Sequence, residues 1–237
     1  MRNSITVFVS LFYLSVLFSQ AIVAQVVDRS LFETSLTGSR NYEGKFKPSY
    51  IYIKNPKKKI TGSFHLFKSW KNIGEIKTIN NKSYGIKNIN FNIRDNSFES
   101  SVGNDSVFVF DLENINFVNI NSRKFKSFYF TEIKSNKIFE IILESNSFLL
   151  LKEYNCGIKI NEPDPLMFRK NTDQYIIKTS YYLKDRNELR KFSLNKKNVL
   201  KLFSDKSTQV AKFAENNNFS FKRDSSLKKI FNYYNSL

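Results

Sequence analysis

Residues that commonly carry catalysis or cross-linking are scarce in this chain of 237 residues. It contains one cysteine, Cys156, and one histidine, His65, together with seven glycines and four prolines. A single cysteine excludes an intramolecular disulfide, and only His65 could serve as the base of a Ser/His/Asp or Cys/His mechanism. A zinc site would need both residues together with carboxylates, and none of the usual ligand spacings is present. The composition therefore favours neither a disulfide framework nor a zinc centre.

Glycine-rich catalytic motifs are missing as well, since neither a phosphate-binding loop nor a Gly-x-Ser-x-Gly elbow occurs. Carboxylate pairs remain as a catalytic route. Glu140 and Glu144 are predicted to share one strand face at about 13 Å separation, which is too far for a glycosidase pair. We expect these carboxylates to be solvated or paired with lysine, His65 to be structural or exposed, and Cys156 to be buried or half-buried. No catalytic, cofactor-binding or metal-binding residue is assigned, and no cofactor is expected.

Aromatic and basic residues are abundant. The chain has 24 phenylalanines and 12 tyrosines, and 41% of its residues are hydrophobic, enough for a substantial β-rich core. The formal net charge of +17 favours polyanionic partners such as nucleic acid, anionic headgroups or acidic polysaccharide. The lysines are also scattered throughout a chain rich in Asn, Ile and Phe, as AT-rich coding sequence produces. Both origins of the charge stay open at this point.

Residues 1–24 have the pattern of an export signal. Arg2 gives a minimal basic start, an apolar run follows, and small residues precede the predicted cleavage between Ala24 and Gln25. Cleavage after Ala21, or retention of the segment as a membrane anchor, is the alternative. No later segment is apolar enough to span a membrane. We expect an exported protein, periplasmic or secreted.

Three apolar runs between Phe125 and Tyr154 predict an antiparallel meander, with tight turns at Ser135-Asn136 and Ser145-Asn146. These turns pair Phe130 with Ile141, Phe128 with Leu143, and Leu143 with Phe148. One face then carries the apolar residues Phe128, Phe130, Phe139, Ile141, Leu143, Phe148 and Leu150. The other face carries Tyr129, Thr131, Glu140, Glu144, Leu149 and Leu151.

Other alternating runs predict strands within 50–54, 60–67, 83–93, 107–110, 115–120, 175–183 and 189–194, with a return strand starting at Phe98. Turn signals recur about every eight to twelve residues, as in a β-sandwich or a partly open barrel.

The pattern becomes helical after residue 194. Three short helices are predicted, with Asp205 and Asp224 as N-caps and Asn216, Asn217 and Asn218 closing the second helix. Leu227, Ile230, Phe231 and Tyr234 have the spacing of one apolar helix face. We therefore predict an α+β fold, mainly antiparallel β, comprising a signal (1–24), a β domain (25–194) and helices docked on it (195–237).

The C-terminal stretch from Tyr181 to Leu237 has a Tyr-Tyr strand at Tyr181, a lysine-rich helix, an Asp-Lys helix start at Asp205 and a closing Tyr-Tyr-Asn-Ser-Leu. In these features it resembles the C-terminal region of uncharacterised exported proteins of flavobacteria and their relatives. Weaker similarity extends upstream, although Arg40 and Asn41 stand where that family usually has Pro-Tyr. The resemblance implies export but no activity.

Three functions are compatible with these features. The first is an exported, non-enzymatic binding or structural protein whose partner is unknown, an envelope component being one candidate. The second is a polyanion-binding envelope protein, for surface polysaccharide or nucleic acid. Its predicted contact residues are Lys57, Lys58, Lys59, Lys222, Arg223, Lys228 and Lys229. The third is a hydrolase whose site is built from loops.

Overall fold

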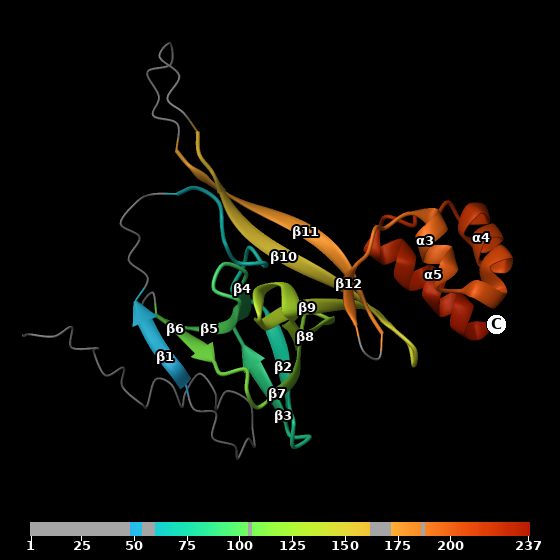
Figure 1. The fold of residues 1–237 in the computed structure, drawn as a ribbon. Coiled ribbons are helices and arrows are strands. Elements are labelled where there is room, and N and C mark those ends of the chain that lie inside the picture. Colours follow the sequence, from blue (N-terminus) through green and yellow to red (C-terminus); the bar gives the residue numbers. More distant parts are fainter. Residues whose placement is uncertain (1–47, 54–59, 104–105, 162–171, 186–187) are drawn as a thin grey trace, which may run out of the picture.

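The computed structural model describes residues 48–53, 60–103, 106–161, 172–185 and 188–237. In these ranges the chain forms two antiparallel β-sheets followed by short helices (Figure 1). The fold is α+β and mainly antiparallel β, as the sequence predicts. The predicted export signal with its cleavage site at Ala24 and Gln25, and the predicted contact residues Lys57, Lys58 and Lys59, lie outside the described residues.

The larger sheet has eight strands. They are β2 (Ile73–Thr78), β3 (Ser83–Lys87), β7 (Ile115–Ile120), β8 (Arg123–Phe130), β9 (Ser135–Glu144), β10 (Leu149–Lys159), β11 (Gln174–Lys184) and β12 (Leu189–Lys191). Their order across the sheet is β12-β11-β10-β9-β8-β7-β2-β3. The strands predicted within 115–120 and 175–183 are confirmed, and β12 confirms the start of the strand predicted within 189–194.

The smaller sheet has the order β1-β6-β5-β4. Its strands are β1 (Pro48–Ile53), β4 (Ile89–Asn92), β5 (Ser97–Gly103) and β6 (Ser106–Phe110). The single strand predicted within 83–93 is wrong, because Asn88 adopts a left-handed conformation (φ 56°) that ends β3 and starts β4 in the other sheet. The return strand predicted from Phe98 is confirmed as β5, which starts one residue earlier and pairs with β4.

Buried side chains from both sheets form one shared core. Phe91 and Phe98 of the smaller sheet contact Phe125 of the larger sheet, with ring centroids 5.9 and 6.0 Å apart. Ile76, Val118 and other residues of the larger sheet complete the same cluster. Neither sheet closes on itself, and the two sheets pack against each other over this core.

The two sheets lie close together at Gly74 in β2. A Cβ atom at this position would lie 2.7 Å from Ile89 Cγ2 of the smaller sheet and 2.8 Å from the Asn119 carbonyl oxygen. No side chain larger than hydrogen fits there without moving one sheet.

The predicted register of the meander is wrong at both turns. A 3-10 turn (Thr131–Ile133) follows β8 directly, so Phe130 pairs with Ser135 and Phe128 with Lys137. At the second turn Leu143 pairs with Leu150. The polar residues at 135 and 136 belong to strand β9, and the left-handed residue of the first turn is Lys134 (φ 51°).

The predicted faces of the meander are also wrong, because both faces of β9 are buried. Leu150 pairs with Leu143 but Leu151 pairs with Ile141, so Ile142 is an extra, bulged residue that breaks the alternation. The predicted apolar set consequently divides between two clusters. Phe130, Phe139 and Ile141 pack with Leu151 and Tyr182, whereas Leu143, Phe148 and Leu150 pack with the helices.

Residues 60–67 do not form the predicted strand. Thr61 and His65 make isolated bridges to Gln174 and Asn92. The strand predicted within 50–54 exists as β1, but it pairs with β6. Residues 60–67 therefore run between β11 and β4 as an irregular segment.

Residues 195–237 form the helical cap, which comprises α3 (Lys196–Lys201), a 3-10 turn (Ser204–Lys206), α4 (Ser207–Asn216) and α5 (Asp224–Ser236). Figure 1 shows the cap beside the larger sheet, on the side away from the smaller sheet. Val199, Phe203, Val210, Leu227, Ile230 and Phe231 are buried with Ile142, Leu143, Phe148, Leu150 and Leu183 of the sheet region. In the described part of the chain, no helix has the length and apolarity needed to cross a bilayer.

The helix ends differ from the prediction in two places. Asp205 lies in the 3-10 turn and Asp224 is the first residue of α5, and neither α4 nor α5 has a side-chain N-cap bond. The predicted end of α4 is confirmed, because Asn218 is left-handed (φ 52°) and the Phe219 amide donates to the Ala214 carbonyl at 2.8 Å.

Gly74→Ala is expected to lower the free energy of unfolding by about 1–3 kcal/mol, because the added methyl group overpacks the contact between the sheets. Thermal unfolding followed by circular dichroism measures the effect. Gly157→Ala is the matched control, since its Cβ would find Ile176 Cγ1 at an ordinary 3.7 Å. Equal melting temperatures for the two variants would contradict the account of Gly74.

Phe231→Asp is expected to detach α5, because it places a charge among Phe148, Phe203 and other apolar side chains. Loss of the packing of a buried phenylalanine alone costs about 3–5 kcal/mol. Limited proteolysis should then cut the C-terminal helix. Asn232→Asp adds the same charge at the neighbouring exposed position and should leave the digestion pattern unchanged.

Candidate functional site

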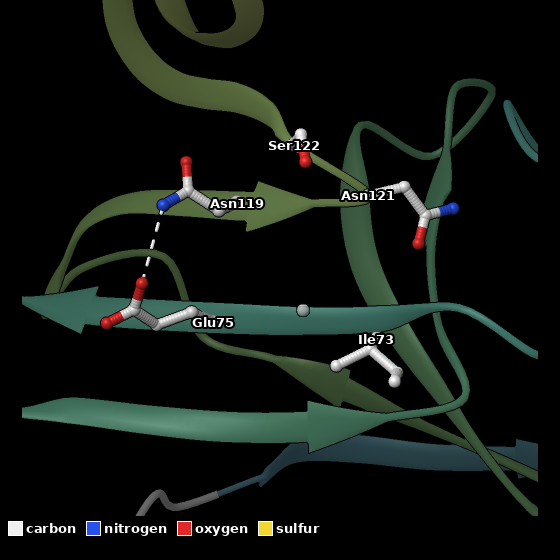
Figure 2. A pocket seen from close by; sticks show the side chains of 6 residues that line it. Ile73, Glu75, Asn119, Asn121 and Ser122 are labelled. Atoms are coloured by element: carbon white, nitrogen blue, oxygen red, sulfur yellow. Dashed lines mark hydrogen bonds between the residues drawn. The ribbon is translucent and has the colours of Figure 1, made fainter.

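An open depression lies on the larger sheet beside the turn between β7 and β8 (Figure 2). Asn121 and Ser122 are both left-handed (φ 48° and 64°), which closes a two-residue hairpin and leaves a space of about 580 Å³ next to β2. Ile73, which is 72% exposed, forms one wall. Glu75 and Asn119 line it and approach each other at 3.4 Å. The Asn121 amide is directed to Asn72, at 2.8 Å. The polar groups of this depression therefore do not converge on one point.

His65 and Glu99 form a buried hydrogen-bonded pair. His65 Nε2 lies 2.8 Å from Glu99 Oε2, and the two side chains are 5% and 0% exposed. Glu99 Oε1 accepts further hydrogen bonds from Asn92 Nδ2 at 2.7 Å and Ser97 Oγ at 3.4 Å. The rings of Phe64 and Trp70 enclose the imidazole. Because both groups are shielded from solvent and hydrogen-bonded, the pair anchors residues 60–67 to the smaller sheet and is not placed to attack a substrate.

Asp95 continues this network towards the surface. It accepts from Asn92 Nδ2 and from the Arg94 guanidinium, at 2.8 and 2.9 Å. The hydrogen bond from Arg94 lowers the pKa of Asp95 below its usual value, against the opposing effect of burial. The Arg94 guanidinium also lies over the Phe64 ring, 4.2 Å from its centroid.

A second buried carboxylate, Glu140, faces the core between the sheets. Arg123 donates to both of its oxygens, at 2.9 and 2.7 Å, and the Tyr154 hydroxyl donates to it as well. Burial and the neighbouring Glu140 charge raise the pKa of the Tyr154 phenol. The Arg123 guanidinium and the Tyr154 hydroxyl thus satisfy both oxygens of the Glu140 carboxylate, which indicates a structural role.

Asp224 joins the helical cap to the sheet. Its carboxylate accepts from Lys152 Nζ at 2.6 Å and from the Tyr181 hydroxyl at 2.8 Å. Lys152 and Tyr181 are direct partners on β10 and β11. Burial, followed by the hydrogen bond to Asp224, raises the pKa of the Tyr181 phenol. Among the described residues, these two hydrogen bonds connect the helical cap to strands β10 and β11 of the larger sheet.

The predicted pairing of Glu140 with Glu144 on one face is wrong. Glu144 is exposed and bonds Lys124 Nζ at 2.7 Å, whereas Glu140 is buried against Arg123. The bulge at Ile142 reverses the alternation between them, so the two carboxylates lie on different faces. Glu144 is paired with lysine, as expected, but Glu140 is paired with arginine in the core.

Cys156 is a free, half-buried thiol. Burial raises its pKa, which keeps it in the unreactive thiol form. Among the described residues, no group of three or more His, Cys, Asp and Glu side chains could hold a metal ion.

The helical cap carries an excess of positive charge. Its sequence has nine basic residues, Lys196, Lys197, Lys201, Lys206, Lys212, Lys222, Arg223, Lys228 and Lys229. Its acidic residues are Asp205, Glu215 and Asp224, and the last of these is bonded to Lys152. None of the nine forms an ion pair with a described residue, and all except the half-buried Lys206 are exposed.

The structure brings four predicted contact residues together at the start of α5. Lys222, Arg223, Lys228 and Lys229 are all exposed, while Leu227, Ile230 and Phe231 face the core. Sequence reasoning missed the role of Asp224, which it interpreted as an N-cap. Lys152 and Tyr181, which bond Asp224, are far from it in the sequence, and no local sequence pattern indicated these contacts.

Comparison with known proteins adds no assignment, because no family model, curated protein or solved structure matches this chain.

Glu99→Gln is expected to destabilise the fold by about 1–3 kcal/mol, because it removes the carboxylate to which the buried His65 ring is hydrogen-bonded. The new amide also faces the Asn92 Nδ2 donor, so that hydrogen bond is at risk as well. Chemical denaturation measures the change. Glu75→Gln removes the same charge from an exposed position with a single 3.4 Å contact, and it should change stability by less than about 0.5 kcal/mol. Equal effects would rule out a structural role for the His65–Glu99 pair.

Proposed function

We propose that this protein is an exported, non-enzymatic binding protein whose helical cap contacts an anionic polymer of the cell envelope. The observation that carries the proposal is the charge of the cap, with nine basic residues against three acidic ones. Because Asp224 is held by Lys152 and Tyr181, it does not neutralise the outer side of the cap. Export rests on the sequence pattern of residues 1–24 and on the resemblance of the C-terminal stretch.

The contacts of the buried carboxylates support a binding role over a catalytic one. Glu99 is enclosed with the only histidine of the chain, and Glu140 is saturated by Arg123 and Tyr154. A general acid or base needs access to the proton it transfers, and these groups are directed into the core.

The spread of the charge favours an extended ligand over a compact one. The basic side chains lie along three helices and the segments between them, and eight of the nine are lysines. Lysine acts as a flexible point charge, whereas arginine provides the fork that recognises a single phosphate or carboxylate group. Many dispersed lysines suit the repeated charges of a polymer.

The proposal predicts that removing charge from the cap weakens polyanion binding more than removing the same charge elsewhere. The cap variant carries Lys222→Gln, Arg223→Gln, Lys228→Gln and Lys229→Gln. The matched control carries Lys82→Gln, Lys134→Gln, Lys159→Gln and Lys178→Gln, all exposed positions on the sheet region. Both variants lose four positive charges, so a difference between them reports location alone.

Retention on immobilised heparin, measured as a function of salt, is the test. For the cap variant we expect elution at clearly lower salt and a slope of log K against log salt reduced by about 0.7–0.9 for each lost contact, by analogy with nucleic acids. The control should elute close to the unmodified protein. Equal shifts for the two variants would refute a binding surface on the cap, and elution of the unmodified protein at low salt would refute polyanion binding altogether.

A further inference from the structure

One side of the helical cap combines aromatic rings with a lysine. The rings of Phe213 in α4 and Tyr233 in α5 stack in parallel, with centroids 3.9 Å apart and an interplanar angle of 9°. Phe219, from the connection between the two helices, meets Phe213 edge-on at 5.7 Å. Lys229 Nζ lies over the Phe219 ring, 5.1 Å from its centroid. We call these four residues the aromatic surface.

The rings of this surface are only half-buried, unlike the core phenylalanines. Phe213, Phe219 and Tyr233 all retain solvent exposure, and Lys229 is exposed. Phe219 and Tyr233 flank the apolar cluster of the cap without being enclosed by it. Apolar ring area therefore reaches the surface beside a cation that forms no ion pair with a described residue.

Two amides lie beside Phe213 on α4. Gln209 lies one turn before it and Asn217 lies one turn after it, and both are exposed. The Asn217 Nδ2 group donates to the Phe213 carbonyl at 2.8 Å, which leaves its side-chain oxygen facing solvent. Glu215 lies two residues after Phe213 and so points to a different side of α4. The surface thus presents rings, amide groups and a cation.

We propose that the aromatic surface contacts the sugar rings of an acidic polysaccharide, with Lys229 pairing with a carboxylate or sulfate group of the chain. This inference rests on the proposed function and names the class of polymer. The apolar faces of sugar rings can cover exposed aromatic area, while their hydroxyl groups are partners for amide side chains. The surrounding lysines of the cap complement the repeated negative charge of such a polymer.

The amides beside the rings favour a sugar over a nucleic-acid base. Phe213 and Tyr233 cover one face of each other and the Lys229 ammonium group lies over Phe219, so only part of each ring is open to a ligand. The remaining ring area is limited and bordered by amides, which suits a ligand rich in hydroxyl groups.

Two adjacent lysines provide a matched pair for the test. Lys228 and Lys229 are both exposed on α5 and carry the same charge. Of these two lysines, only Lys229 lies over an aromatic ring of a described residue. On heparin, Lys229→Gln should weaken binding about tenfold, the loss of a direct hydrogen bond to a charged group. Lys228→Gln should weaken it about twofold, through screened electrostatics. Tyr233→Leu, which keeps an apolar side chain but removes the ring, should also weaken binding to heparin.

Polyphosphate and single-stranded DNA separate the alternatives. Polyphosphate has no rings, so Lys228→Gln and Lys229→Gln should reduce its binding equally and Tyr233→Leu should not reduce it.

Melting temperatures of all variants show whether they remain folded. Equal losses for the two lysine variants on heparin, or tighter binding of DNA than of heparin at the same salt, would overturn the inference while leaving polyanion binding by the cap intact. If the unmodified protein bound none of the three polymers, the proposed function itself would be wrong.

Discussion

Three phenylalanine rings join the two sheets in a shared core. Phe91 and Phe98 contact each other at 5.5 Å and both contact Phe125, and all three are at most 1% exposed. Burial of each ring contributes about 1.5–3 kcal/mol. The glycine at position 74 lets the sheets approach closely beside them. Arg123 lies 5.4 Å from the Phe125 ring, so the Glu140 cluster borders the same core.

The smaller sheet contacts the larger one where strands β9 and β10 separate. Strand β9 pairs with β10 from Leu149 to Lys152, after which the two strands separate. Beyond that pairing, the side chain of Asn96, in the turn between β4 and β5, bonds the backbone of β9. Its Oδ1 accepts from the Ile138 amide at 3.0 Å and its Nδ2 donates to the Asn136 carbonyl at 3.1 Å. A side chain thereby satisfies backbone groups that would otherwise lack partners. Beyond this point β10 and β11 continue together as a two-stranded ribbon (Figure 1).

The helical cap combines an apolar attachment with a basic exterior. Phe231 and its neighbours bury the inner side, and Asp224 adds hydrogen bonds to Lys152 and Tyr181. The same aspartate is thereby withdrawn from the exposed side, where Lys228 and Lys229 lie. The carboxylate of Asp224 attaches the start of α5 to the larger sheet. Because it is used there, it does not offset the positive charge of Lys228 and Lys229 on the exposed side.

The sequence by itself determined the strands that have short-range periodicity and the buried side of α5. Ile115–Ile120 and the spacing of Leu227, Ile230 and Phe231 are examples, and each depends on residues a few positions apart. Of the candidate contact surface, the exposure of Lys222, Arg223, Lys228 and Lys229 follows from that same spacing. Tertiary structure alone decided the meander register, the bulge at Ile142, the division of residues 83–93 between two sheets and the partners of Asp224. Lys152 is 72 positions from Asp224, and the stacking of Tyr233 on Phe213 joins two helices. Such contacts depend on which distant segments meet in space, and local periodicity carries no record of that.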